Sequence, residues 1–158
     1  MTEAKRLEEG DKAPDFSLPG AGGEKHGLAS YKGKKLALYF YPKDDTSGCT
    51  KEAIEFNGLR DKFAKAGTVI LGVSPDPEKS HDKFRAKYDL KIPLASDETK
   101  AMLSAYGVWV EKSMYGRKYM GVERTTFLID GNGRIAKVWR KVKVPGHAEE
   151  VLAAAKAL

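Results

Sequence analysis

The sequence predicts an α/β protein in which helices flank a mixed central β-sheet. Three observations carry this prediction: buried strands alternate with helical segments, an antiparallel hairpin follows them, and the chain closes on a helix-forming segment. The chain has 158 residues, and no repeat or linker divides it. We therefore expect residues 1–158 to form a single domain with a sizeable hydrophobic core.

The first part of the predicted sheet is a strand, helix, strand unit. The runs LALYFY at Leu36–Tyr41 and TVILGV at Thr68–Val73 are short and continuously apolar, as strands buried on both faces are. Between them, apolar residues recur at helical spacing over Ser47–Ala66, and Gly67 is placed to end the helix. This length suits two parallel strands joined by a right-handed crossover helix.

Two more helices, a hairpin and a closing helix are predicted further along. Pro77–Tyr88 (PEKSHDKFRAKY) predicts a helix opened by a proline, and Glu98–Tyr106 predicts a shorter one. Thr125–Asp130 (TTFLID) and Arg134–Trp139 (RIAKVW) flank the turn GNG, which is a strong hairpin signal. The closing segment HAEEVLAAAKAL is a good helix former.

The composition is moderately basic. The chain has 28 Lys and Arg against 22 Asp and Glu, and the formal net charge of +6 favours solubility and attracts anionic partners. The densest basic stretch, Arg134–Lys143, interleaves charges with apolar residues as the solvated face of a strand does. We therefore expect no nucleic-acid binding.

Neither a secretory signal nor a membrane span is predicted. The first residues, MTEAKRLEEG, are charged and lack an apolar core, and no apolar run approaches the roughly 20 residues that cross a bilayer. The single cysteine, Cys49, is consistent with a reducing compartment. We expect a cytoplasmic protein that contacts no membrane.

One cysteine also limits the redox chemistry. Cys49 cannot form a disulfide within the chain, so any redox cycle must take its second thiol from another molecule. Because no Cys-x-x-Cys pair is present, a thiol–disulfide oxidoreductase is disfavoured.

The segment YPKDDTSGCTKEA, Tyr41–Ala53, places Cys49 where chemistry is favoured. It follows the carboxyl end of a buried strand, which is where catalytic groups of α/β sheets gather. The segment that precedes Cys49 offers four candidate N-cap residues, which are Asp44, Asp45, Thr46 and Ser47. The cysteine is therefore expected in or next to the first helical turn. Free backbone N–H groups and the positive end of the helix dipole favour a thiolate there. Ionisation alone increases the thiolate fraction roughly thirtyfold at most, so efficient catalysis by a cysteine also requires stabilisation of the charge that develops in the transition state.

An inert role for the cysteine is the alternative. A free cysteine usually behaves as a small buried hydrophobe. Counting about 100° per residue, Cys49 shares a helix face with Ala53, Phe56 and Phe63, as a core residue does.

The chain resembles peroxiredoxins of the bacterioferritin comigratory protein, or peroxiredoxin Q, group. The resemblance runs from GDKAPDFSLP (Gly10–Pro19) through FYPKDDTSGCTKEA and YGVWVEKSMYGRKYMGVERTTFLID to GRIAKVW. It implies a thioredoxin-like fold and a thiol-dependent peroxidase that reduces hydrogen peroxide and organic hydroperoxides.

The family's site residues can be carried over onto matching positions. Pro42, Thr46 and Cys49 match the Pro-x-x-x-Thr-x-x-Cys signature, and Arg124 in ERTTFLID matches the distant arginine. The resemblance implies that Cys49 is the nucleophile and that Thr46 hydrogen-bonds the bound peroxide. It also implies that Pro42 shields the sulfur from water and that Arg124 holds the thiolate and polarises the peroxide.

Two departures from the family pattern bear on the cycle. Ser47 stands where many members have proline, and Ile54 stands where many have a resolving cysteine. The reductant must therefore be an external thiol, for which glutathione, glutaredoxin and thioredoxin are candidates. Ile54 is expected on the outer helix face, as part of an apolar surface for substrate, reductant or dimer contact or as a scattered exposed residue.

Other constellations point to no further chemistry. The three histidines, His26, His81 and His147, lack the spacing of metal ligands with Cys49, so we expect no metal and no cofactor. GAGG at residues 20–23 is expected to be a turn, and Asp44 and Asp45 are expected to cap the helix. The rival function is a non-catalytic thioredoxin-fold module that binds an acidic partner. For either function we expect a monomer or a weak homodimer.

Overall fold

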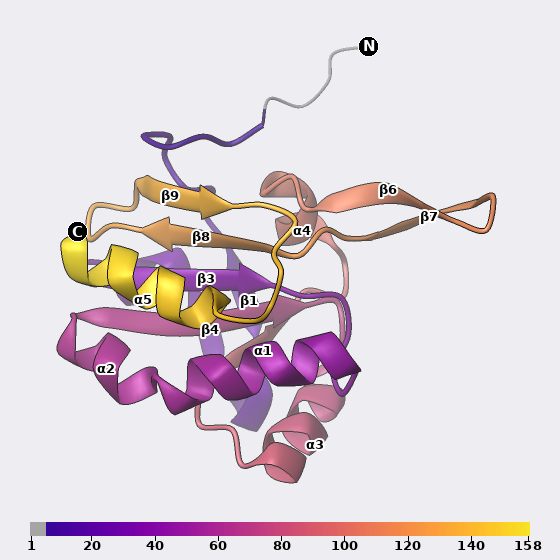
Figure 1. The fold of residues 1–158 in the computed structure, drawn as a ribbon, viewed down its shortest axis with the longest axis horizontal. Helices are drawn as coiled ribbons and strands as arrows, with labels where there is room; N and C mark the ends of the chain where they lie inside the picture. Colours follow the sequence, from indigo (N-terminus) through magenta and orange to yellow (C-terminus); the bar gives the residue numbers. More distant parts are fainter. Residues whose placement is uncertain (1–5) are drawn as a thin grey trace.

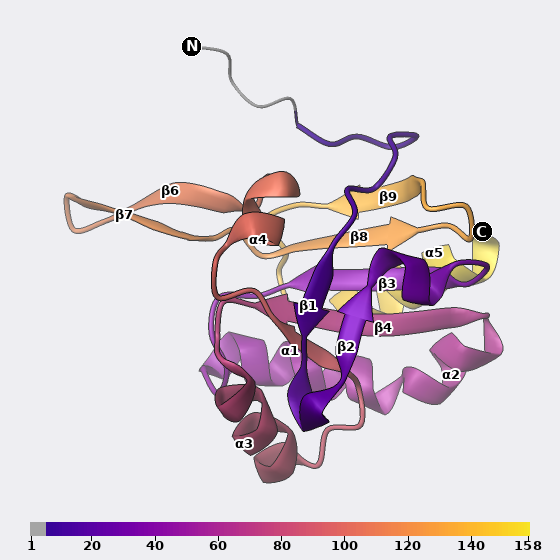
Figure 2. The ribbon, with the colours of Figure 1, turned by 180° about the vertical axis from the view of Figure 1, so that it is seen from behind.

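The computed structural model describes residues 6–158, with a five-stranded mixed sheet at the centre (Figures 1 and 2). The strand order is β5-β4-β3-β8-β9. Their bounds are Lys35–Phe40 for β3, Thr68–Ser74 for β4, Leu94–Ser96 for β5, Thr125–Ile129 for β8 and Ile135–Trp139 for β9. β3, β4 and β5 are parallel, whereas β8 is antiparallel to both of its neighbours. The predicted mixed sheet, parallel first pair and GNG hairpin are confirmed.

Helices and short strands cover the two faces of this sheet. Helices α1, α2 and α5 lie together on the face seen in Figure 1, and α4 with strands β1 and β2 lies on the face seen in Figure 2. The third helix, α3, packs near the β5 edge. The bounds are Ser47–Gly58 for α1, Arg60–Lys65 for α2, Glu78–Tyr88 for α3, Ala101–Ala105 for α4, His147–Ala157 for α5, Ser17–Pro19 for β1 and Lys25–Gly27 for β2; short 3₁₀ turns span Ala21–Gly23 and Leu28–Tyr31. Within residues 6–158, no helix combines the length and apolar character needed to cross a membrane.

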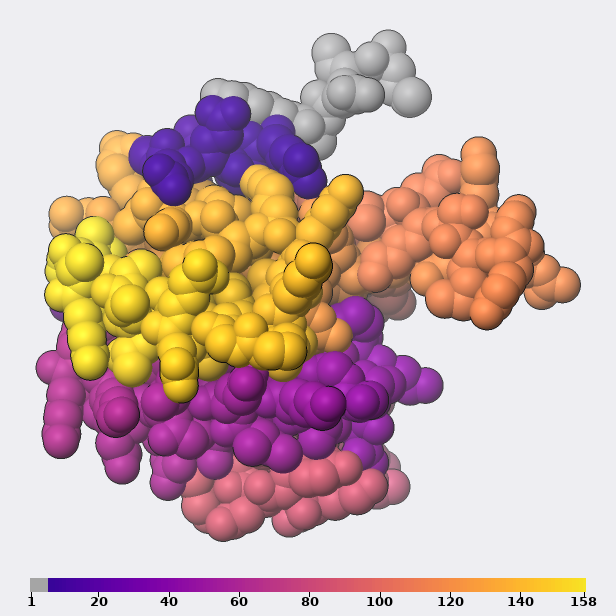
Figure 3. Space-filling view, in the orientation of Figure 1, coloured from indigo at the N-terminus to yellow at the C-terminus, as the bar shows by residue number. Residues whose placement is uncertain are grey.

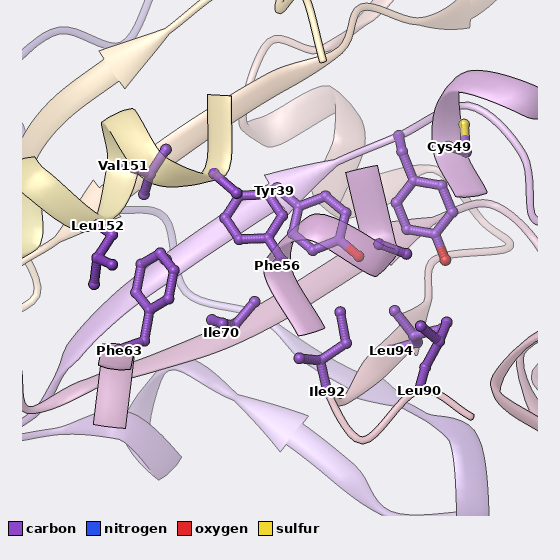
Figure 4. Close-up of a cluster of buried hydrophobic side chains, with 14 of the residues drawn as sticks. Tyr39, Cys49, Phe56, Phe63, Ile70, Leu90, Ile92, Leu94, Val151 and Leu152 are labelled. Atoms are coloured by element: carbon purple, nitrogen blue, oxygen red, sulfur yellow. The ribbon is translucent and has the colours of Figure 1, made fainter. Parts of the chain in front are cut away.

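Strand β3 separates two hydrophobic clusters. Ala37 and Tyr39 face the cluster under α1, α2 and α5, which Figure 4 shows, whereas Leu38 and Phe40 face the cluster on the other side. The ring of Tyr39 stacks on Phe56 of α1 with centroids 4.6 Å apart. Because both faces are covered, the strand is a continuous apolar run instead of an alternating one.

The single helix predicted for Ser47–Ala66 is wrong, because two helices occupy this segment. The backbone leaves helical geometry at Leu59, where φ is −101° and ψ is 3°. Asn57 and Gly58 are weak helix formers, and the Asn57 side chain accepts a hydrogen bond from the Lys91 N–H at 2.7 Å. The contact between Asn57 and Lys91 therefore favours the end of α1 at Gly58, although the helical spacing of apolar residues continues beyond it.

The helix predicted from Glu98 starts later, at Ala101. Lys100 has a left-handed backbone with φ of 64°, so a right-handed helix cannot run through this residue and α4 begins after it. The Asp97 carboxylate instead accepts a hydrogen bond from the Leu103 N–H at 2.8 Å.

The sequence analysis missed a second hairpin, formed by β6 (Trp109–Met114) and β7 (Arg117–Val122). Its turn is Tyr115–Gly116, with φ of 52° and 77°. Tight hairpin turns of this kind usually carry Asn-Gly or Asp-Gly, because tyrosine seldom adopts a positive φ. The local turn signal is therefore absent. The short strands β1, β2 and β5 were also missed.

Candidate active site

Cys49 lies in the first turn of α1, just beyond the carboxyl end of β3. Thr46 occupies the N-cap position, and its carbonyl accepts the first helical hydrogen bond from the Thr50 N–H at 2.8 Å. Cys49 is the third residue of the helix, so the free N–H groups of the first turn and the positive end of the dipole are close to its side chain. The predicted location in the first turn is confirmed.

The guanidinium of Arg124 reaches this sulfur from the segment between β7 and β8. Its Nη2 lies 3.2 Å from Cys49 Sγ, and its Nη1 donates a hydrogen bond to Glu52 Oε1 at 2.6 Å. A Cβ on Gly48 would lie 3.3 Å from Nη2, so a glycine at this position leaves room for the guanidinium. Cys49 and Glu52 are three residues apart on one helix, which lets a single planar cation contact both.

Glu52 is the part of this cluster that the sequence analysis missed. Its carboxyl group is buried, and its Oε2 has no hydrogen-bond partner among residues 6–158. Burial raises the pKa of Glu52 to about 7; Arg124 opposes the rise and the charge of Glu55 adds to it. Burial acts to lower the pKa of Arg124, but the charges of Glu52 and Cys49 and the hydrogen bonds to them together raise it. A carboxylate three residues after the cysteine was the signal, because that spacing shares a helix face.

Replacing Glu52 with glutamine is expected to change how stability depends on pH. A carboxyl whose pKa is raised in the folded state gives stability that is full below its unfolded value of 4.5 and is lost as pH rises through about 7. The wild type should therefore lose about 2 to 3 kcal/mol relative to Glu52→Gln between pH 4.5 and 8. Urea unfolding at several pH values measures the difference. Parallel curves for the two proteins would contradict a strained buried carboxyl.

Asp44 does not cap α1, and the prediction of a capping role is wrong. Its buried carboxylate accepts hydrogen bonds from Tyr41 Oη at 2.6 Å and Ser80 Oγ at 2.8 Å, and its Oδ2 lies 2.7 Å from His81 Nδ1. These partners lie on β3's C-terminal extension and on α3. Asp44 therefore ties the segment before Cys49 to α3.

Asp45 is likewise no helix cap. Its backbone is left-handed, with φ of 58°, and its side chain points to α3. The carboxylate accepts hydrogen bonds from Lys87 Nζ at 2.8 Å and Tyr88 Oη at 2.5 Å. Sequence spacing alone gave no hint that helix α3, whose Ser80 is 36 residues from Asp44 and whose Lys87 is 42 residues from Asp45, would bind both aspartates.

Thr46 and Pro42 lie in the same segment as Cys49. The Thr46 hydroxyl donates a hydrogen bond to the Lys43 carbonyl at 2.8 Å, so it occupies the N-cap position without bonding a helical N–H. The Thr46 hydroxyl hydrogen is therefore committed to the Lys43 carbonyl, and the lone pairs of Thr46 Oγ1 remain free to accept a hydrogen bond. Pro42 is half-buried directly after the buried Tyr41.

The alternative of a core cysteine is partly right. Cys49 is only 1% exposed and belongs to the same hydrophobic cluster as Ala53. Figure 4 shows it with Tyr39 and Phe56 of that cluster. What distinguishes it from an inert core cysteine is the cation within hydrogen-bonding distance of its sulfur. Within residues 6–158, no cluster of three His, Cys, Asp or Glu side chains could hold a metal ion.

His147, at the start of α5, lies close to the same arginine. Its Nε2 is 2.8 Å from Thr126 Oγ1, and its ring packs against Phe56 and Trp139. Burial, together with the smaller effect of the charge of Arg124, lowers the pKa of His147 to about 4. A neutral imidazole is therefore built into this part of the core.

Acidification is expected to destabilise the protein through His147. A histidine with a lowered pKa gives stability that is full above its unfolded value of 6.5 and is lost as pH falls through about 4. We expect the wild type to lose about 2 kcal/mol relative to His147→Gln between pH 6.5 and 4. Thermal unfolding over this range tests the sign, which is opposite to that of Glu52. Equal losses in both proteins would count against a buried neutral ring.

Ile54 lies on the outer face of α1 and is 47% exposed, as the helical spacing predicted. It borders a small hollow of about 230 Å³ between α1 and the start of α5. The lining residues are Ile54, Glu55, Gly58, Leu59, Gly146, Ala148 and Glu149.

Comparison with known proteins finds close relatives over nearly the whole chain. Residues 9–138 match the AhpC/TSA family. A putative peroxiredoxin Bcp of Coxiella burnetii is 53% identical over 146 residues, covering 92% of this chain and 97% of the relative. Peroxiredoxin Q of Xanthomonas campestris superposes with a TM-score of 0.87 at 50% identity, over 90% of each chain. A structure of the Xanthomonas campestris bacterioferritin comigratory protein, described for its alkyl peroxide reduction activity, gives 0.86 at 49% identity, again over 90% of each chain.

Proposed function

This chain belongs to the AhpC/TSA family and is a thiol peroxidase with a thioredoxin fold, and from that premise we propose that Cys49 is its peroxidatic nucleophile. One observation carries the proposal: Arg124 Nη2 lies 3.2 Å from the Cys49 sulfur, at the head of a helix. A guanidinium stays charged at any relevant pH and offers several donors in one plane. It therefore favours the thiolate and can also meet charge on a departing oxygen.

The oxidation step is a displacement at oxygen. The Cys49 thiolate attacks one oxygen of the hydroperoxide, the O–O bond breaks, and the other oxygen leaves as water or an alcohol after taking a proton. Cys49 becomes a sulfenic acid. Arg124 stabilises the charge that develops on the leaving oxygen, and Glu52 holds the guanidinium in place.

Thr46 and Pro42 complete the proposed site. Because the Thr46 hydroxyl already donates to Lys43, its oxygen is oriented to accept a hydrogen bond from the peroxide. Pro42 offers no N–H and limits the access of water to the sulfur. We propose hydrogen peroxide and organic hydroperoxides as substrates, in line with the alkyl peroxide reduction described for the Xanthomonas relative.

The sulfenic acid is returned to the thiolate by a thiol reductant. Because the sequence has no second cysteine, we propose that this thiol is external, as in glutathione, glutaredoxin or thioredoxin. Dependence on such a pool favours the cytoplasm as the site of action. We further propose that residues 1–158 act as one domain, as a monomer or weak homodimer.

Mass spectrometry after one equivalent of hydrogen peroxide tests the proposal. We expect a single added oxygen on Cys49, and a mixed disulfide when glutathione is also present. An unmodified Cys49 would refute the assignment. The rival reading, a non-catalytic module, is not favoured by the family membership; it predicts salt-sensitive polyanion binding that is indifferent to Cys49.

The exposed apolar surface at Ile54 is proposed to assist contact with substrate or reductant. Replacing Ile54 with serine is expected to lower turnover about two- to fivefold with at least one peroxide or reductant, because part of the surface is lost. Steady-state assays with paired substrates measure this. Unchanged turnover with every pair would make Ile54 a scattered surface residue.

A further inference from the structure

The hairpin of β6 and β7 projects from the body of the protein as a free ribbon, which Figures 1 and 3 show. We call residues 109–122 the arm. Of six large apolar side chains that are exposed in residues 6–158, four lie on the arm, and they are Met114, Tyr115, Tyr119 and Met120. Tyr115 at the tip is 98% exposed. Apolar side chains gathered in this way on a soluble surface mark an interaction site.

The root of the arm is fixed in the core beside the candidate active site. Val122 is buried and Trp109 packs against the same cluster. Two residues after Val122 the chain reaches Arg124, whose guanidinium contacts Cys49. A partner seated on the arm therefore lies next to the Cys49 end of the sheet.

The register of the hairpin divides the arm into two different faces. Side chains that are directly opposite in an antiparallel pair share a face. One face carries Val110, Lys112, Met114, Arg117 and Tyr119, and we call it the Tyr119 face. A Cβ on Gly121 would lie 3.3 Å from Lys112 Cδ and 3.4 Å from Tyr119 Cε2, so both side chains fold over this glycine.

The opposite face has its charge compensated. There Lys118 Nζ lies 3.6 Å from Glu111 Oε1. On the Tyr119 face, by contrast, Lys112 and Arg117 have no carboxylate within 4.0 Å among residues 6–158. The Tyr119 face is thus apolar and positively charged together.

The positive charge of the Tyr119 face favours an acidic protein over a second copy of this chain as the partner that binds there. A second copy of the chain has a formal net charge of +6, so arm-mediated pairing would bring like charges together. A protein with a negative surface around an apolar patch would complement both the cations and the tyrosines.

We propose that the Tyr119 face docks an acidic protein that carries the reducing thiol for Cys49. The inference depends on the proposed one-cysteine cycle. The partner's thiolate attacks the Cys49 sulfenic sulfur, the S–O bond breaks, and the hydroxide takes a proton from solvent and leaves as water, which forms a mixed disulfide between the two proteins. A second thiol of the same partner, as its thiolate, then attacks the partner's sulfur in the mixed disulfide, so Cys49 leaves as thiolate and the partner keeps an internal disulfide.

Matched substitutions on the two faces of the arm test the proposal. Turnover is measured with a thioredoxin of net negative charge, recycled by its reductase, and separately with dithiothreitol. Tyr119→Ser and the double variant Lys112→Glu/Arg117→Glu should lower kcat/KM for thioredoxin at least about tenfold. Met120→Ser, on the opposite face, should change it less than about twofold. Raising the salt from about 0.05 M to about 0.3 M should further weaken the wild type, Met120→Ser and Tyr119→Ser, which keep both cations, but not the double variant.

Several results would overturn the proposal. One is an unchanged kcat/KM for thioredoxin in the Tyr119-face variants, and another is an equal loss with dithiothreitol, which would indicate a structural effect. A dimer in sedimentation that the same variants dissociate would identify a second copy as the occupant. Failure of peroxide to oxidise wild-type Cys49 would instead refute the proposed function, so the two failures are distinguishable.

Discussion

Replacing Cys49 with serine is expected to reduce peroxide consumption at least about a thousandfold, to the background rate of the buffer. A serine hydroxyl is not ionised near neutral pH and cannot be oxidised to a sulfenic acid, so neither half of the cycle can run. Stopped-flow mixing of the protein with hydrogen peroxide, followed by intrinsic fluorescence or by residual peroxide, measures the loss. The wild type should react much faster than free cysteine.

Stability must be compared before this result is interpreted. The serine oxygen can still accept a hydrogen bond from Arg124, so we expect the variant to fold and its urea unfolding midpoint to stay near that of the wild type. Thr50→Ser, one residue further along the same helix, is a matched control that removes one methyl group. Substantial peroxide turnover by a folded Cys49→Ser protein would place the chemistry elsewhere.

The sequence predicted the elements whose signals are local. Leu36–Tyr41 and Thr68–Val73 are buried on both faces of the sheet, so their apolar runs are readable without a partner. The break at Leu59 and the Tyr115–Gly116 turn could not be predicted in the same way. The first depends on a contact with Lys91, and the second places a tyrosine in a conformation that tyrosine rarely adopts.

In the candidate site, too, the residues with local sequence signals could be predicted from them and those that depend on distant contacts could not. The position of Cys49 at a helix start followed from the strand before it and the cap residues around it. Arg124 entered only through the family resemblance, because nothing local in ERTTFLID says that its side chain crosses to α1. The roles of Asp44 and Asp45 were misjudged, since their partners lie on α3. Helical spacing alone would have found Glu52, had the face of Cys49 been searched for charges.

Replacing Arg124 is expected to have the second largest effect, and the choice of substitute separates charge from geometry. Arg124→Lys keeps a cation, but one ammonium cannot reproduce the two contacts that Nη1 and Nη2 make with Glu52 and Cys49. We expect the second-order rate of oxidation to fall about a hundredfold, which is about 2.7 kcal/mol of lost transition-state stabilisation. Arg124→Met should lower it about a thousandfold, because the charge is lost as well.

The fate of Glu52 in these variants supplies an independent measurement. Without the cation, the buried carboxyl loses the one interaction that lowers its pKa, so Glu52 should become protonated in Arg124→Met at neutral pH. Adding Glu52→Gln to Arg124→Met should then cost no further activity, whereas Glu52→Gln alone should cost about three- to tenfold because the guanidinium is held less firmly. Arg134→Lys, at the exposed residue just before β9, is the matched control and should leave the rate unchanged. Additive losses in the double variant would show that Glu52 acts on the sulfur by some route other than Arg124.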